Sequence, residues 1–225
     1  EMKLPAVPDN DWQDMPKAAV SHSNSMHFGI DQFPENQKRM WSGYLATVTY
    51  MDEQVGRILN ALKNLELDTK TAVFFTSDHG YLLGEHHFWQ KSNLREEVTR
   101  VPLIIRSPMM NPGTTNSIVE LADMFPTACE LSGLPIPSSV QGRSLLPLLQ
   151  NPLVKVRNSA LSFVKQGTSM RNARWSYMRY EDGSEELYDM SKDPKQLTNL
   201  ANSIDAGNLM SEIRSAFDTR ITEIR

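Results

Sequence analysis

Residues 71–91 read TAVFFTSDHGYLLGEHHFWQK, and this stretch indicates the fold most clearly. Residues 71–76 form an uncharged run of β-branched and aromatic residues, which is typical of a strand buried on both faces of a sheet. The run ends just before Asp78, His79 and Gly80. Because ligand sites in open α/β sheets lie outside the carboxyl ends of strands, we expect a functional site here.

The residues after this strand have the chemistry of a metal and anion site. Asp78 offers carboxylate oxygen and His79 offers imidazole nitrogen, and both atom types bind divalent cations. Gly80 allows a tight turn beside them. Lys91 carries a mobile positive charge suited to an anionic oxygen. Taken alone, Asp78, His79 and Gly80 are equally compatible with a polar turn at a strand end.

Bulk composition narrows the class of protein. A chain of 225 residues can bury a sizeable core and fits one domain, or one domain with a small appendage. The apolar fraction of 40% and the charged fraction of 22% are those of an ordinary globular protein. The net charge of -4 gives no reason to expect nucleic acid as a partner. No apolar run approaches the roughly 18 residues of a transmembrane helix, so we expect no membrane partner.

A long amphipathic helix is predicted before the central strand, at residues 34–65. Pro34 and Glu35 suit its first turn, and apolar residues then recur at three- and four-residue spacing. We expect this stripe to pack in the core; it comprises Met40, Tyr44, Val48, Met51, Val55, Ile58, Leu59 and Leu62. Residues 1–33 lack such a period and predict an irregular arm, in which His22 and His27 are expected to be surface or packing side chains.

Helices and strands alternate after the central strand, as in a layered α/β sheet. Strands are predicted at 101–106 and 117–120, and a short helical turn at 145–149. A helix is predicted at 124–131, with Asp123 as its N-cap and Gly133 at its end. Cys129 lies on the apolar face of that helix, which favours a buried core thiol; as the one cysteine it cannot form an internal disulfide.

The pattern changes after residue 155. Short strands are predicted at 160–164, 175–180 and 186–188, with residues 181–184 as a hairpin turn between the last two. A final helix is predicted at 203–224. We therefore expect residues 1–154 to form part of a large mixed sheet flanked by helices. Residues 155–225 are expected to form a small C-terminal antiparallel sheet with one helix.

Several motifs together resemble the sulfatase family, within the alkaline phosphatase superfamily. The strongest is SDHG at 77–80, followed by GEH at 84–86 and then by Trp89 and Lys91. Its order and spacing are most similar to the iduronate 2-sulfatase branch. Further matches occur in the same order as in the family: YMDEQVGR at 50–57, VPLI at 101–104, DMFPT at 123–127, GRSLLPL at 142–148 and ELYD at 186–189.

The resemblance implies a sulfuric ester hydrolase acting on a sulfated carbohydrate. By this likeness Asp78 and His79 would bind the metal, usually Ca²⁺, and Lys91 would be the catalytic lysine that contacts the sulfate. No role is carried over to His86, His87 or Trp89. Arg95, Arg100, Arg143 and Arg171 are candidates to meet a uronate carboxylate, and none of them is singled out.

Two family features are absent from this sequence. The sulfatase nucleophile is a Cys or Ser, oxidised to formylglycine, in a Cys/Ser-x-Pro-x-Arg motif, whereas Cys129 lies in CELSG. The aspartates of the family's first strand are missing too. We therefore expect a C-terminal half that is inactive without an N-terminal half carrying the formylglycine. We also expect an exported protein, in a bacterial periplasm or outside the cell, with a lysosomal location as the alternative.

Two other functions remain open at this stage. One is a phosphoester hydrolase of the same superfamily, in which the missing half would supply a Thr or Ser nucleophile. The other is a non-catalytic fragment that keeps the sheet and part of the metal site.

Overall fold

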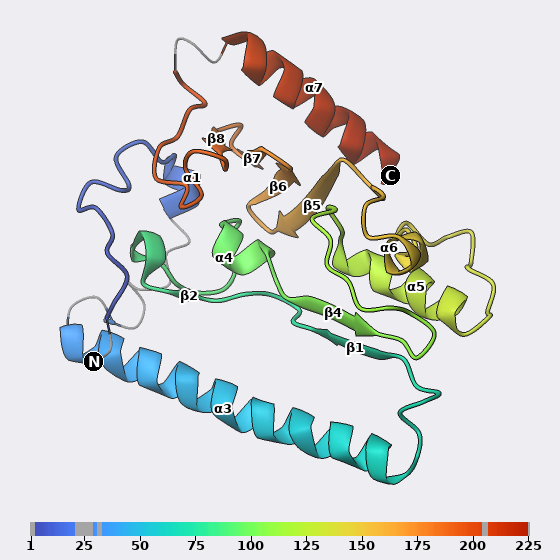
Figure 1. Ribbon diagram of the computed structural model, residues 1–225. Helices are drawn as coiled ribbons and strands as arrows, with labels where there is room; N and C mark the ends of the chain where they lie inside the picture. Colours follow the sequence, from blue (N-terminus) through green and yellow to red (C-terminus); the bar gives the residue numbers. More distant parts are fainter. Residues whose placement is uncertain (1–2, 21–28, 31–32, 204–206, 225) are drawn as a thin grey trace. The chain divides into compact units, whose positions relative to one another are not determined.

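The computed structural model describes residues 3–20, 29–30, 33–203 and 207–224 (Figure 1). His22, His27 and residues 204–206 of the last predicted helix lie outside the described residues, and Ser203, its expected first residue, is not helical. The chain divides into two compact units, which we describe separately. The first unit comprises Glu1–Trp12, His22–Ser92 and Glu97–Met110, and the second comprises Gln13–Ser21, Asn93–Glu96 and Asn111–Arg225.

The central strand of the first unit is β1 (Val73–Thr76), which confirms the predicted strand at its carboxyl end. It pairs antiparallel with β4 (Leu103–Arg106), with Val73 opposite Arg106 and Thr76 opposite Leu103. The expectation of burial on both faces is wrong for the described residues. Every residue of β1 is half-buried, because among the described residues β4 is its strand partner and no further strand extends that pair.

The long helix α3 (Pro34–Asn64) confirms the helix predicted before β1, with proline in its first turn. Its apolar stripe was expected in the core, and that expectation is wrong for the described residues, because no residue of α3 is buried. The stripe members Tyr44, Val48, Met51, Ile58 and Leu59 are between 36% and 63% exposed. Helical periodicity reports which side chains share a face, and it does not say what covers that face.

A short hairpin follows β1 in the first unit. It consists of β2 (Leu82–Leu83), the 3-10 turn η1 (Glu85–His87) and β3 (Trp89–Gln90). Leu83 and Trp89 form a small buried cluster with Ile30, against which the start of α3 packs. The chain then forms α4 (Glu96–Thr99) before β4.

The second unit contains the predicted antiparallel sheet. Its strands are β5 (Ser159–Val164), β6 (Gly167–Asn172), β7 (Trp175–Tyr180) and β8 (Glu185–Asp189), in the order β5-β6-β7-β8. The helix α7 (Gly207–Glu223) lies along this sheet (Figure 1). Their shared core contains Tyr177, Leu187, Ile213 and Phe217. Strand β6 was not predicted, because GTSMRN lacks a run of β-branched or aromatic residues.

Short helices complete the second unit. They are α1 (Lys17–Val20), η2 (Leu121–Asp123), α5 (Met124–Leu131) and α6 (Leu146–Gln150). The helix α1 falls inside the arm that was expected to be irregular. The helix predicted at 124–131 is confirmed, Cys129 on it is buried, and Gly133 follows it with a φ of 68°.

Two local expectations in this unit are wrong. Asp123 does not cap α5, because its carboxylate accepts hydrogen bonds from the backbone amides of Glu120 and Arg143 and pairs with Arg157. The strand expected at 117–120 is reduced to one isolated bridge between Ile118 and Arg157. No helix in the described parts of the chain is long and apolar enough to cross a membrane.

Candidate functional site

The turn that follows β1 is fixed by its own side chains. The Ser77 hydroxyl donates to the backbone carbonyl of His79 at 2.7 Å, and the backbone amide of His79 donates to Asp78 Oδ1 at 3.0 Å. These two bonds span the three residues that leave the strand. They hold the Asp78 and His79 side chains beside each other at the carboxyl end of β1.

The hydrogen bond of His79 determines which ring nitrogen is available to a ligand. His79 Nδ1 lies 2.8 Å from the carbonyl oxygen of Gly80. Because a carbonyl oxygen only accepts, Nδ1 carries the proton in this bond, and in the neutral ring Nε2 keeps its lone pair. Nε2 is the nitrogen that lies 3.7 Å from Asp78 Oδ1.

The Asp78–His79 pair has the donor atoms and spacing of two neighbouring metal ligands. Ca²⁺ binds oxygen ligands at about 2.3–2.6 Å, and two ligands at such distances and at roughly right angles stand about 3.5 Å apart. The 3.7 Å separation is close to that value, and the Asp78 and His79 side chains are 86% and 32% exposed. In the described residues no group of three or more His, Cys, Asp or Glu side chains is placed to hold a metal. The pair therefore fits part of a divalent-cation site.

Gly80 is required here by a close backbone approach. Its amide donates to the carbonyl of Val98 at 2.8 Å, which brings the segment at α4 against the turn. A Cβ atom at position 80 would stand 1.9 Å from the carbonyl oxygen of Glu97. The sequence pointed to glycine as the residue of a tight turn, and the structure adds this steric reason.

Lys91 follows β3 and is exposed. Its two neighbours, Gln90 and Ser92, have φ values of 71° and 70°, in the left-handed region that side-chain-bearing residues rarely adopt. Trp89, to which no role was assigned from the sequence, is 1% exposed and belongs to the buried cluster with Ile30 and Leu83. The lysine thus stands on a tightly constrained hairpin.

A buried contact between an imidazole of this hairpin and a carboxylate was not predicted from the sequence. His86 Nδ1 lies 2.9 Å from Asp11 Oδ2, and the two side chains are 2% and 0% exposed. The residues are 75 positions apart, and no local pattern links them. His86 was noted within the GEH motif, whereas Asp11 lies in the arm and belongs to no motif that the sequence analysis identified.

The four arginines suggested as substrate contacts are placed very differently. Arg95 is 1% exposed and donates to Glu186 at 2.6 Å, so it is not available to a substrate. Arg171 donates to Glu96 at 3.0 Å. Arg143 donates to the carbonyl of Val156, whereas Arg100 is exposed.

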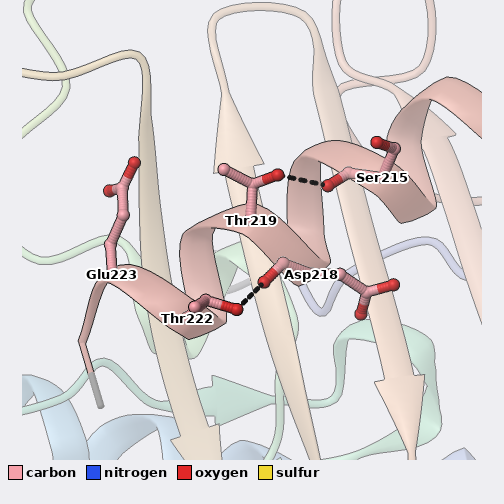
Figure 2. Close-up of a pocket in the computed structure, with 5 residues that line it drawn as sticks. All are labelled: Ser215, Asp218, Thr219, Thr222 and Glu223. Carbon is pink, nitrogen blue, oxygen red and sulfur yellow. Dashed lines mark hydrogen bonds between the residues drawn. The ribbon is translucent and has the colours of Figure 1, made fainter.

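Figure 2 shows a pocket on the surface of α7, lined by Ser215, Asp218, Thr219, Thr222 and Glu223. Two of its hydroxyls bond within the helix, because Thr219 donates to the Ser215 carbonyl and Thr222 donates to the Asp218 carbonyl, each at 2.9 Å. This pocket belongs to the second unit, whereas Asp78 and His79 belong to the first. It is not the site that the sequence predicted.

Two family models match the chain. The model described as Sulfatase matches residues 9–134. The model described as N-sulphoglucosamine sulphohydrolase, C-terminal, matches residues 84–223. The first match contains Asp78, His79 and Lys91, and the second contains the β5–β8 sheet with α7.

Curated relatives carry sulfatase names. A sulfatase of Formosa agariphila is 31% identical, over 90% of this chain and 41% of that protein. An N-acetylglucosamine-6-O-sulfatase of Bacteroides thetaiotaomicron is 37% identical, over 70% of this chain and 31% of that protein. The arylsulfatase K of Homo sapiens is 34% identical, over 73% of this chain and 34% of that protein. The chain thus spans about two fifths or less of the length of these relatives, and their names differ from iduronate 2-sulfatase.

Solved structures share the fold. BT4656, solved in complex with its substrate D-glucosamine-2-N,6-O-disulfate, aligns with a TM-score of 0.75 and 31% identity, over 80% of this chain and 40% of that one. The phosphonate monoester hydrolase of Silicibacter pomeroyi aligns with a TM-score of 0.86 and 25% identity, over 99% of this chain and 51% of that one. Each of the two alignments covers at least 80% of this chain.

Proposed function

The chain belongs to the sulfatase family, and on that premise we propose that the whole protein hydrolyses sulfate esters of sugars. In this proposal Asp78 and His79 contribute to the metal site, and Lys91 contacts the sulfate. The observation that carries it is the placement of an exposed carboxylate oxygen 3.7 Å from a histidine nitrogen at the end of β1. Two ligands so arranged are part of a set that further residues would complete.

Asp78 and His79 would bind a divalent cation, proposed to be Ca²⁺, which when bound stabilises negative charge on sulfate oxygens. The protein prepares both ligands in advance. The Ser77 and Gly80 hydrogen bonds fix the backbone and the ring tautomer, so little reorganisation is needed when the cation binds.

Lys91 would supply a second positive charge at the sulfate. Sulfate-ester hydrolysis builds up charge on the sulfuryl oxygens and on the leaving oxygen. A pre-positioned ammonium group is most effective where that charge develops. Lys91 is an exposed residue at the end of a constrained hairpin, where an anionic substrate can approach it.

We propose that the formylglycine nucleophile lies in an N-terminal half of the same protein. In favour of this, the chain spans 41% of the length of the Formosa agariphila sulfatase. The exposed stripe of α3 from Val48 to Leu59 offers an apolar surface that such a half would bury. Residues 1–154 would then be the C-terminal part of the main α/β domain, and residues 155–225 its small antiparallel subdomain.

The proposed substrate is a sulfated amino sugar or a related sulfated carbohydrate. BT4656 was solved with D-glucosamine-2-N,6-O-disulfate, and the Bacteroides thetaiotaomicron relative is named an N-acetylglucosamine-6-O-sulfatase. Specificity for sulfated iduronate would rest on the motif spacing alone. An exported location, expected from the sequence, is part of the same proposal.

A phosphonate monoester hydrolase is the second candidate. The observation in its favour is the TM-score of 0.86 with the Silicibacter pomeroyi enzyme, over 99% of this chain. A bound cation and a lysine would stabilise phosphonate oxygens by the same electrostatics as sulfate oxygens.

A substrate panel tests the proposal. The full-length protein would be assayed with 4-nitrophenyl sulfate, D-glucosamine-2-N,6-O-disulfate and a phosphonate monoester, with and without added Ca²⁺. We expect release of sulfate at a kcat/KM well above that for the phosphonate. A preference for the phosphonate would favour the second candidate, and no turnover of any ester would overturn both.

A further inference from the structure

The hairpin that carries Lys91 has an unusual backbone. Its 3-10 turn has φ values of 57° at both His86 and His87, and Gln90 and Ser92 also have positive φ. Residues with a Cβ atom avoid this region, because their side chain approaches the following carbonyl oxygen. A run of such residues persists only where the surroundings fix it, and such runs cluster at functional sites.

The segment at residues 8–12 supplies that fixing. His86 Nδ1 lies 2.9 Å from Asp11 Oδ2, in a pair that is almost completely buried. Trp12 Nε1 donates to the backbone carbonyl of the same histidine at 2.6 Å. The Trp12 ring also stacks on Phe88, with ring centroids 5.7 Å apart. One short segment thus holds the ring of His86, its backbone and the residue that ends the turn.

The Asp11 carboxylate is unusual for a purely structural group. Its Oδ1 atom is buried and has no hydrogen-bond partner in the described part of the chain, so Oδ2 carries the contact with His86. Buried ion pairs can often be replaced by apolar side chains with no loss of stability. A buried carboxylate that bonds to one imidazole is better explained by the geometry that it imposes than by stability.

We propose that Asp11 and His86 are positioning residues that hold the 84–92 loop in the conformation that presents Lys91. This inference rests on the proposed role of Lys91 as the sulfate contact. Asp11 fixes the ring of His86, the ring fixes the left-handed turn, and the turn sets the direction in which the chain enters β3 and reaches Lys91. Neither residue touches the substrate in this scheme.

Hydrogen exchange tests the holding step without any assay of activity. The amides of Gly84, His87 and Phe88 donate to backbone carbonyls inside the loop, so their exchange reports its opening. In the full-length protein, Asp11→Ala is expected to speed the exchange of these amides by about 10-fold or more and to leave the exchange rates of the β5–β8 amides unchanged. Asp11→Asn keeps an oxygen that accepts from His86 Nδ1 and is expected to restore most of the protection.

Asp9→Ala is the matched control, because it removes the same charge from the same segment and its side chain is exposed. Its loop exchange is expected to equal that of the wild type. Unchanged exchange in Asp11→Ala, or equal acceleration in Asp9→Ala, would overturn the inference.

Kinetics of the full-length protein test the positioning step. With 4-nitrophenyl sulfate, Asp11→Ala is expected to lower kcat by about 10-fold or more, with a smaller change in KM and partial recovery in Asp11→Asn. Equal kcat in Asp11→Ala and Asp9→Ala would contradict a positioning role. If the wild type released no sulfate, the proposed function would fail, and the exchange experiment would still show whether the pair holds the loop.

Discussion

Gly80 shows at the scale of one residue why the turn after β1 tolerates no side chain. Because an added Cβ would stand 1.9 Å from the Glu97 carbonyl oxygen, Gly80→Ala must displace backbone. We expect it to lower the free energy of unfolding by about 3 kcal/mol, at the upper end of overpacking costs. Urea denaturation measures the change.

Gly43→Ala is the matched control for that substitution. Gly43 lies in α3 and has no atom within 4 Å of an added Cβ. Alanine there is expected to stabilise the chain by up to about 1 kcal/mol through helix propensity. Equal effects of the two substitutions would contradict the steric role of position 80.

Glu186 is a second residue whose environment determines the outcome of a substitution. It is 0% exposed and accepts hydrogen bonds from Arg95, Tyr180 and Tyr188. Glu186→Ala removes the carboxylate that pairs with the buried Arg95 guanidinium, which is expected to cost about 3–5 kcal/mol of unfolding free energy. Chemical denaturation of the variant measures this loss.

Two further variants check this explanation. Glu181→Ala, at an exposed turn position, is expected to stay within about 0.5 kcal/mol of the wild type. The double change Arg95→Met with Glu186→Met removes both charges and is expected to cost less than Glu186→Ala. A double variant less stable than Glu186→Ala would show that the loss of the Arg95–Glu186 pairing is not the cause.

At the scale of elements, β7, β8 and α7 are joined by a carboxylate. Glu185 on β8 accepts from Arg214 on α7 and from the hydroxyl of Tyr177 on β7. The Arg214 hydrogen bonds, followed by that of Tyr177, lower the pKa of the Glu185 carboxyl. A carboxyl with a lowered folded pKa stabilises the protein above its unfolded pKa of about 4.3, and this stability is lost as the pH falls.

Glu185→Gln is therefore expected to remove part of the acid sensitivity. Because the Arg214 side chain is 49% exposed, the pair should contribute about 1 kcal/mol at pH 7. The variant should lose less unfolding free energy than the wild type between pH 7 and pH 3 in urea titrations. Glu212→Gln, exposed on α7, is the control, and equal pH profiles for wild type and Glu185→Gln would contradict the prediction.

The elements that could be predicted are those that depend on local sequence patterns. Periodicity and an initial proline give α3, and the turn at 181–184 gives the β7–β8 hairpin. Strand β6 was not predictable, because its pairing with β5 and β7 compensates for a weak strand sequence. Of the candidate site, Asp78 and His79 are neighbours in sequence, whereas the Asp11–His86 pair depends on a contact across 75 positions.

At the scale of the whole molecule, the exposed stripe of α3 predicts different effects of substitution in the 225-residue chain and in the full-length protein. Ile58 and Leu59 are 63% and 42% exposed, so Ile58→Lys with Leu59→Gln should change the stability of the 225-residue chain by less than about 0.5 kcal/mol. In the full-length protein the same pair should cost about 2–5 kcal/mol, because the proposed N-terminal half would bury both side chains. Denaturation of both forms measures the difference.

Asn60→Lys, an exposed residue on the opposite side of α3, is the control and should be neutral in both forms. A full-length protein as indifferent to the double change as the isolated chain would show that the stripe is not an internal interface.

The most direct test of the proposed site is sulfate release by the full-length protein after Asp78→Ala. The proposal predicts that kcat on 4-nitrophenyl sulfate falls by at least about 100-fold with the fold intact, because a metal ligand is removed where charge develops. Asp52→Ala, which removes an exposed carboxylate from α3, should keep wild-type turnover. Wild-type kcat in Asp78→Ala would contradict the assignment of this turn to the catalytic centre.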